Sequence, residues 1–329
     1  MTWHTSLRRP TQIVGPRLTS DFTYSSGRLT SLTQTDTTTH IVPYSTNGQT
    51  RSWAFTYSTT GDLLTVDGPL AGTGDTVTYT YDASGFVDTI TDEVGHVTQV
   101  LSKNASGQPL TIRDANGVDT AMTYDERNRL KTVTVNPGAS QAVTGIDYDL
   151  AGNVTRVTAP DGFYLNYTYD DARRVTSIEN NAGQRQDLTY DLDGNVTARV
   201  IKNAAATTVF SESSAYDELG RLLQKIGAAS QTTTFAYDKT DLLKTVTDPR
   251  SNLYSYAYDA LSRLIRETDQ ESAQVNYGLD ARDGLGSYSD PRSLTTSYVR
   301  NGFGEVIQET SPDSGATVYT RNAWAMSRR

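Results

Sequence analysis

The side chains best suited to acid–base or metal chemistry in this chain are three histidines, His4, His40 and His96. They fall at unrelated positions, and no two of them have the short spacing that is typical of metal ligands. The chain has no cysteine, which excludes a disulfide framework, thiol catalysis and thiolate metal sites. The histidines are therefore predicted to be ordinary surface or strand residues.

Acidic residues are the second possible source of catalytic chemistry, because two neighbouring carboxylates can divide the roles of acid and base. The positions open to this interpretation are Asp170 with Asp171, Asp280 with Asp283, and Asp313. Aspartate recurs at regular intervals along this chain, however, so such pairs arise without any need for catalysis. The sequence favours a structural role for them.

One segment, 191–195, imitates a calcium-binding loop with the sequence Asp-Leu-Asp-Gly-Asn. With Gly194 at the sixth loop position, Thr189 and Val200 take the first and twelfth positions, where Asp and a bidentate Glu are needed. Neither a Gly-x-Ser-x-Gly nucleophile motif nor a Gly-x-x-x-x-Gly-Lys phosphate loop is present. We predict no catalytic residue, no cofactor-binding residue, no metal ligand and no cofactor, and hence no enzyme.

The regular spacing of the aspartates belongs to a repeat, Tyr-Asp-x-x-Gly-x-Leu/Val. Good copies begin at Tyr81, Tyr148, Tyr190 and Tyr216, and weaker or degenerate copies stand at Lys103, Tyr124, Tyr169, Tyr237, Tyr258, Leu279, Arg300 and Arg321. Successive steps between these slots are 22, 21, 24, 21, 21 and 26 residues, followed by five of 21. A fixed period of this size indicates one supersecondary unit stacked many times.

A second turn signal stands half a period after each Tyr slot, where Asp or Asn is followed three residues later by Gly. It is complete at Asp92 with Gly95, Asp114 with Gly117 and Asn180 with Gly183, whereas Asp248, Asp269 and Asp290 retain the acidic residue alone. Asp and Asn side chains bond to the backbone two residues on, and Gly accepts the positive φ that closes such turns. Each repeat therefore contains two turns.

Between the turns, apolar and polar residues alternate with a period of two, as in 77–81, Val-Thr-Tyr-Thr-Tyr. Alternation rich in Thr, Tyr and Val is typical of half-buried strands, and no helical apolar stripe is present. The predicted fold class is all-β: a repetitive antiparallel meander of β-hairpins with about two strands per repeat. The Tyr rings are expected to share one face, where cross-strand packing is the main interpretation and stacking on sugars the alternative.

The regular 21-residue array is expected over 81–329, and repeats interrupted by insertions over 1–80, where Tyr24, Tyr44 and Tyr57 are irregularly spaced. No linker separates a catalytic domain. The net charge of −9 argues against a nucleic-acid partner, which requires a basic groove. No apolar run is long enough to span a membrane, and no signal peptide is visible at the N-terminus.

The Tyr-Asp-x-x-Gly-x-Leu anchors and the Asp-x-x-Gly second turns resemble those of the YD-repeat, or Rhs-repeat, proteins of bacteria. Segments 106–117 and 298–306 are similar to characteristic stretches of that family, and the likeness covers essentially the whole chain. The resemblance implies a β-strip that coils into a hollow shell, which in large members encloses a C-terminal toxin. The plug and the aspartate-type self-cleavage segment of such shells have no counterpart in this sequence.

The resemblance therefore implies the structural wall of an encapsulating shell for a secreted or surface-delivered toxin, without plug or cargo. The partners it implies are an enclosed C-terminal toxin domain or further repeats of a longer chain, whose truncation would explain both ends of this sequence. The alternative is a cell-surface carbohydrate-binding module with glycans as partners. We expect a secreted or cell-surface location, no nucleic-acid partner and no membrane span.

Overall fold

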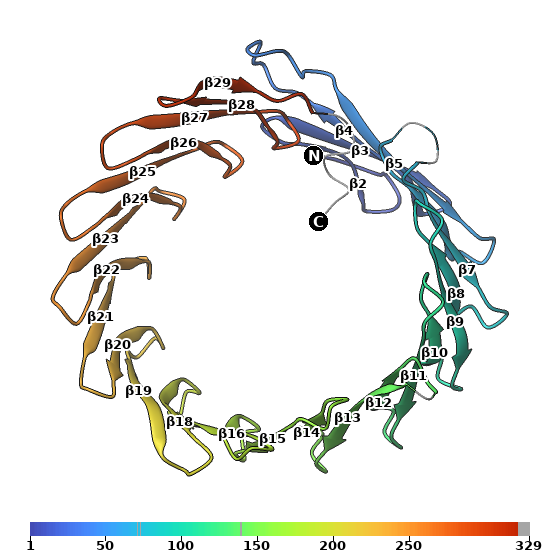
Figure 1. Ribbon diagram of the computed structural model, residues 1–329. Helices are drawn as coiled ribbons and strands as arrows, with labels where there is room; N and C mark the ends of the chain where they lie inside the picture. Colours follow the sequence, from blue (N-terminus) through green and yellow to red (C-terminus); the bar gives the residue numbers. More distant parts are fainter. Residues whose placement is uncertain (71, 73, 139, 322–329) are drawn as a thin grey trace. The chain divides into compact units, whose positions relative to one another are not determined.

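The computed structural model describes residues 1–70, 72, 74–138 and 140–321 of the chain. These residues form 29 β-strands and no helix, and the strands follow one another in sequence order (Figure 1). The ladders join sequence neighbours in antiparallel register, for example β13 to β14 and β14 to β15. The predicted all-β antiparallel meander is confirmed. In the described part of the chain no helix has the length and apolarity needed to cross a membrane.

The first half of the strands comprises β1 (Thr2–Trp3), β2 (Pro10–Val14), β3 (Leu18–Ser25), β4 (Arg28–Asp36), β5 (Thr50–Tyr57), β6 (Leu63–Asp67), β7 (Val77–Tyr81), β8 (Val87–Thr91), β9 (Val97–Lys103), β10 (Pro109–Arg113), β11 (Asp119–Tyr124), β12 (Leu130–Val135), β13 (Ala142–Tyr148), β14 (Val154–Thr158) and β15 (Tyr164–Tyr169). The second half comprises β16 (Val175–Asn180), β17 (Arg185–Tyr190), β18 (Val196–Lys202), β19 (Thr208–Tyr216), β20 (Leu222–Gly227), β21 (Thr232–Tyr237), β22 (Leu243–Thr247), β23 (Leu253–Tyr258), β24 (Leu264–Thr268), β25 (Gln274–Leu279), β26 (Leu285–Ser289), β27 (Thr295–Arg300), β28 (Val306–Ser311) and β29 (Gly315–Val318).

The described turns that follow the Tyr slots from Tyr81 to Arg300 share one construction, and 82–86 illustrates it. The backbone N–H of Asp82 donates to Phe86 O, and that of Gly85 donates to Asp82 O. Asp82 Oδ1 accepts the backbone N–H groups of Ser84 and Phe86. This is a type I turn closed by a left-handed residue, and it leaves a bulge in the ladder at the Tyr slot itself.

The left-handed position of this turn does not require glycine. Where the sequence has other residues in the Gly slot, they still adopt positive φ: Asn128 (60°), Arg173 (62°), Asp241 (65°) and Ser262 (63°). In the second turn the same holds for Ser251, Ser272 and Ser293, which follow the three acidic residues that seemed to lack a glycine partner. The turn hydrogen bonds therefore maintain the same turn conformation at positions where the residue is not glycine.

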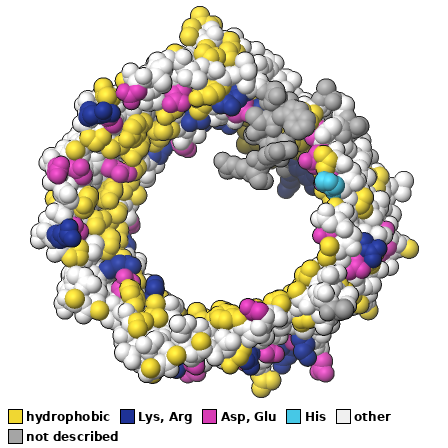
Figure 2. Space-filling view, in the orientation of Figure 1, with side chains coloured by type: hydrophobic (Ala, Val, Ile, Leu, Met, Phe, Trp, Pro, Cys, Tyr) yellow, Lys and Arg dark blue, Asp and Glu magenta, His cyan; other side chains and the backbone are white. Residues whose placement is uncertain are grey.

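The two faces of the sheet differ in chemistry. One carries the Tyr slots and the apolar residues across from them, and we call it the Tyr face; it is half-buried along most strands. The other carries threonines that bond across strands, for example Thr80 to Thr89 at 2.6 Å and Thr123 to Thr132 at 2.6 Å. Figure 2 shows hydrophobic side chains gathered over β25–β27, where the Tyr277 and Tyr288 rings lie 6.0 Å apart.

No second layer of described residues packs on the Tyr face, and the surface area reflects this. The chain exposes 20041 Å², whereas a compact globular protein of its mass would expose about 13,000 Å². Among the described residues Ile307 is the single buried hydrophobic side chain. Stability therefore comes from contacts between neighbouring strands, as in other repeat proteins.

By its internal contacts the chain divides into two units. One comprises Met1–Val100, Ala257–Glu267 and Ser272–Arg329, and the other comprises Leu101–Tyr256 and Thr268–Glu271. The first unit thus contains strands from both the beginning and the end of the sequence. The proposed division into irregular repeats over 1–80 and a regular array over 81–329 stays a prediction.

Candidate functional site

The anchor tyrosines bind each repeat to the one before it. The hydroxyl of Tyr148 donates to Leu130 O at 2.8 Å, and that of Tyr190 donates to Val175 O at 2.7 Å. The acceptor is the carbonyl of the apolar residue that follows the preceding Tyr turn, and the same bond recurs at Tyr81, Tyr124, Tyr169, Tyr216 and Tyr237. We call this contact the Tyr clasp.

Two slots that seemed degenerate in the sequence form the same clasp with arginine. Arg300 Nε donates to Leu285 O at 3.1 Å, and Arg321 Nε donates to Val306 O at 2.7 Å. A guanidinium N–H replaces the phenol O–H because both groups are donors at the end of a long side chain. The repeat period alone predicts the position of these slots, but not the hydrogen bond that arginine makes there.

A second arginine position, the residue after the left-handed turn residue, strengthens the clasp. Arg174 Nε donates to Asp170 Oδ2 at 2.7 Å within its own turn, and its Nη1 donates to Asp191 O of the next Tyr turn at 2.9 Å. The same guanidinium lies 4.6 Å from the ring centroid of Tyr190, within the range of a cation–π contact. Arg129 over Tyr148 and Arg221 over Tyr237 repeat this arrangement.

These contacts lower the pKa of the turn aspartates. The guanidinium of Arg129 is the main cause of the lowered pKa of Asp125, and the guanidinium of Arg221 is the main cause for Asp217. For Asp170 the backbone N–H of Arg174 contributes most and its guanidinium follows. Since the lowering favours the charged form in the folded chain, these carboxylates stabilise the fold while they are ionised.

We therefore expect stability to fall in acid. A group whose pKa is lower in the folded state contributes stability above its unfolded pKa, about 3.9 for Asp, and loses it as the pH falls through the folded pKa. The midpoint of thermal unfolding should thus be level near neutral pH and drop steeply below about pH 4. Thermal unfolding followed by circular dichroism across this range measures it.

The double variant D125N/D217N should flatten this acid limb, because Asn retains the Oδ1 acceptor and does not titrate. Asn203 already holds such a turn, accepting the backbone N–H groups of Ala205 and Thr207. Asp193, whose carboxylate accepts no hydrogen bond from the described residues, provides the control substitution D193N. An equally steep acid limb in the double variant would show that these two carboxylates do not contribute to it.

The candidate residues of the sequence do not come together. His4 Nδ1 accepts the backbone N–H of Leu7 at 3.3 Å, His40 Nε2 lies 3.2 Å from Thr46 Oγ1, and His96 Nδ1 lies 3.0 Å from Asp92 Oδ2. The described residues contain no group of three or more His, Cys, Asp or Glu arranged to hold a metal ion.

Three of the acidic candidates, Asp170, Asp280 and Asp283, take part in turns or ion pairs. Asp170 bonds within its own Tyr turn, and Asp280 pairs with Arg17 at 2.7 Å. Asp283 instead binds Arg263 at 2.8 Å, so Asp280 and Asp283 have separate partners. The backbone N–H of Asp313 donates to Ser311 Oγ at 3.3 Å. In the imitation calcium loop, Asp191 Oδ1 accepts the backbone N–H of Asn195 at 2.8 Å, as the repeat predicts.

The most deeply buried part of the first unit is a polar contact between its two sequence-distant parts, which we call the seam. It joins the connection between β4 and β5 to the turn between β27 and β28. Asp36 is fully buried, and Asn301 is 1 % exposed. Asp36 Oδ2 accepts the backbone N–H of Gly302 at 2.6 Å, and its Oδ1 accepts both the N–H and the hydroxyl of Thr38.

Burial alone would raise the pKa of Asp36, but the hydrogen bonds from Thr38 and Gly302 outweigh it and leave the pKa below its ordinary value. Gly302 fits because it has no side chain. A Cβ at this position would collide with the backbone oxygen of Arg17 and lie 2.6 Å from Asp36 Cγ. The seam is thus built for close backbone approach.

A second contact of the seam is an ion pair. Arg51, 4 % exposed, donates from Nη2 to Glu305 Oε2 at 2.8 Å, and its guanidinium lies 4.1 Å from the ring centroid of Phe303. Asn301 Nδ2 donates to the same Glu305 oxygen at 2.8 Å. The hydroxyl of Tyr44 donates to Tyr319 O at 2.6 Å. Of the irregularly spaced tyrosines, Tyr24 and Tyr57 form clasps, and Tyr44 belongs to the seam.

The sequence matches the family model described as teneurin YD-shell over residues 75–202 and 145–319. These stretches together cover most of the chain. The chain belongs to the YD-shell family. It matches no curated protein, but it is similar in fold to solved structures that contain TccC3.

Two of these structures show the likeness of the YD-shell chain. In the crystal structure of TcdB2–TccC3–Cdc42 the TM-score is 0.60, with 14 % sequence identity, over 93 % of this chain and 21 % of the other. In the Photorhabdus luminescens Tc holotoxin pore carrying TccC3-D651A the TM-score is 0.61, with the same identity and coverage. The chain therefore spans about a fifth of the length of the solved chains it resembles. Family and fold are those of a structural shell repeat.

Proposed function

We propose that this YD-shell chain forms part of the wall of a hollow shell that encloses a polypeptide cargo, a toxin domain released into another cell. The observation that carries the proposal is the sheet: one layer of 29 strands with a half-buried Tyr face that no second layer of described residues covers. An apolar face of this extent is rarely left to water in a soluble protein. Inside a shell, it would face a confined chain.

The comparisons support the same proposal. One structure of similar fold is named a Tc holotoxin pore and contains TccC3, which is also present in the other, and the family is named for a shell. A toxin component acts outside the cell that makes it, so we propose a secreted or surface-delivered location. We propose a structural role, because the turn aspartates bond within their own turns and Asp36 is held in the seam.

A protection experiment tests the enclosure of a cargo. An unfolded segment with one protease site is fused after Arg329, and the rate of its cleavage is compared with that of the same segment on a small monomeric carrier. We expect cleavage to slow by at least tenfold, and the seam variant R51M to restore part of the rate. Equal cleavage on both carriers would contradict the proposal.

The carbohydrate-binding alternative receives less support from the side chains. The anchor Tyr hydroxyls donate to backbone carbonyls, and guanidinium groups cover several of the rings. Stacking on sugars requires free ring faces. A panel of glycans added to the purified chain serves as the second arm of the experiment, and a saturable change in intrinsic fluorescence with any of them would favour the alternative.

A further inference from the structure

The connection between β6 and β7 departs from the repeat. Most half-period turns are tight, as at Asp92, whose backbone N–H donates to His96 O. Between Asp67 and Val77 the connection is longer, and the Tyr slots on either side, Tyr57 and Tyr81, are 24 residues apart instead of 21. Insertions in repeat proteins map to loops on one face, which is often the binding face. This insertion creates a cavity.

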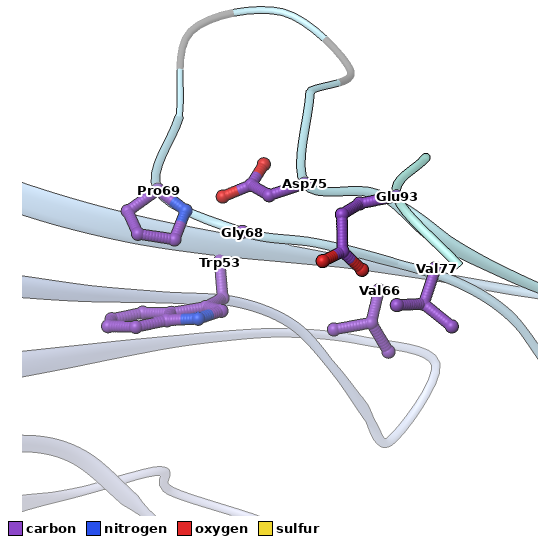
Figure 3. Close-up of a pocket in the computed structure, with 7 residues that line it drawn as sticks. All are labelled: Trp53, Val66, Gly68, Pro69, Asp75, Val77 and Glu93. Atoms are coloured by element: carbon purple, nitrogen blue, oxygen red, sulfur yellow. The ribbon is translucent and has the colours of Figure 1, made fainter. Parts of the chain in front are cut away.

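The cavity lies on the Tyr face and has a volume of about 220 Å³. Its residues are Trp53, Val66, Gly68, Pro69, Asp75, Val77 and Glu93. Val66 pairs with both Phe55 and Val77, which sets these apolar side chains on one face. In Figure 3 the indole of Trp53 lies on the side opposite Asp75 and Glu93, and Val66 and Val77 lie at one end.

Its two carboxylates have acceptor capacity to spare. Asp75 Oδ2 accepts the backbone N–H of Leu70 at 2.9 Å, but Asp75 Oδ1 is buried and has no hydrogen-bond partner. A buried acceptor without a donor is costly and unusual in a native protein. Glu93 is exposed and forms no ion pair with the described residues. The lining contains no Lys or Arg, so the charge of the cavity is negative.

We propose that this cavity binds a single alkylammonium or guanidinium group, the end of a Lys or Arg side chain. The two carboxylates supply charge-assisted acceptors, and an indole is the ring that attracts cations most strongly. The aliphatic stem of such a side chain packs on apolar residues while its head stays polar, which matches Val66, Val77 and Pro69. This inference holds whether or not the chain encloses a cargo.

The size of the cavity supports this class of ligand. Pockets for small-molecule ligands usually measure about 300–1,000 Å³, and this one is smaller. It therefore fits one side chain better than a whole metabolite. A neutral sugar would leave both carboxylates uncompensated, whereas one cation neutralises part of their charge.

Trp53 serves as the reporter in the test. In a background of W3F/W324F it is the remaining tryptophan of the chain. The fluorescence of this variant is titrated with n-butylammonium, with Nα-acetyl-lysine amide and with n-butanol, a neutral compound of similar shape. We expect a saturable change with the two cations, weakened by added salt, and at least tenfold weaker binding of butanol.

The variants E93Q and D75N are expected to weaken cation binding at least tenfold together. Asn at position 75 retains an acceptor for the Leu70 N–H, and Glu93 is exposed, so E93Q alone provides the answer if the double variant misfolds. Tighter binding of the lysine amide identifies a polypeptide as the source of the cation, and tighter binding of butylammonium identifies a free amine. No saturable change, equal binding of butanol, or unchanged binding by E93Q would overturn the proposal.

Discussion

The substitution R51M should lower the free energy of unfolding of the first unit by about 3–5 kcal/mol, the usual loss when one partner of a buried ion pair is removed. Met preserves the aliphatic volume but removes the cation beside Glu305, whose side chain is only 13 % exposed. The Glu305 carboxylate then keeps the side-chain amide of Asn301 as its partner. The contact of the guanidinium with Phe303 is lost as well. Urea unfolding followed by circular dichroism measures the loss.

Repeat arrays can unfold in parts, so the measurement also needs to be local. Amide hydrogen exchange should accelerate at the seam, in 36–51 and 301–305, far more than in β13–β16. The control is R292M, which removes the exposed ion pair of Arg292, 70 % exposed, with Asp290. Surface pairs contribute little, so R292M should unfold like the parent chain. If R51M and R292M behave alike, the seam does not stabilise the unit.

The second large effect is expected for G194V. Gly194 has φ of 94° in its Tyr turn, a conformation that a β-branched residue adopts only with strain. The nearest atom to an added Cβ is Arg174 Nη1 at 3.8 Å, so the space is open and the cost is one of backbone conformation, about 1–3 kcal/mol. G152V, at φ of 96°, should behave in the same way. Thermal and urea unfolding give both values.

A matched control tests whether the conformation is the cause. Gly145 lies within β13 without positive φ, and an added Cβ would approach Thr158 Cβ at an ordinary 3.9 Å. Val favours strands over Gly, so G145V should leave stability unchanged or raise it. Destabilisation of G145V to the same extent as G194V would mean that any Val disturbs the hairpin. Equal stability of G194V, G152V and G145V would show that positive φ is not the cause of the loss.

The periodicity of the sequence was sufficient to predict the fold class, because each repeat carries its own register. The bulge falls at the Tyr slot even where the residue is Leu279 or Arg300. The 26-residue step from Tyr190 to Tyr216 also keeps the bulge at the Tyr slot. The additional residues lengthen the paired strands β18 and β19, and the turn between them at Asn203 has the usual hydrogen bonds. Local rules therefore extend along the whole array.

The seam and the cation cavity could not be predicted from the periodicity of the sequence. Asp36 and Gly302 are in contact although 266 positions separate them. Such a contact depends on the sum of small rotations between repeats, and the residue pattern of a single repeat does not predict that sum. The cavity depends on where Gly68, Pro69 and Asp75 of one insertion lie relative to Trp53. The irregular spacing before Tyr81 was the available signal, because it marked the part of the chain where the repeat was interrupted.

The separation of the two halves of the seam also sets an order in time. During synthesis, Arg51 emerges 254 positions before Glu305, which at about 5–20 residues per second is a delay of roughly 10–50 s. Hairpins form within about 10 μs, so the first repeats are complete long before their distant partner exists. Until then Asp36 and Arg51 remain hydrated, and a newly made chain passes through a long-lived stage in which this polar contact is open.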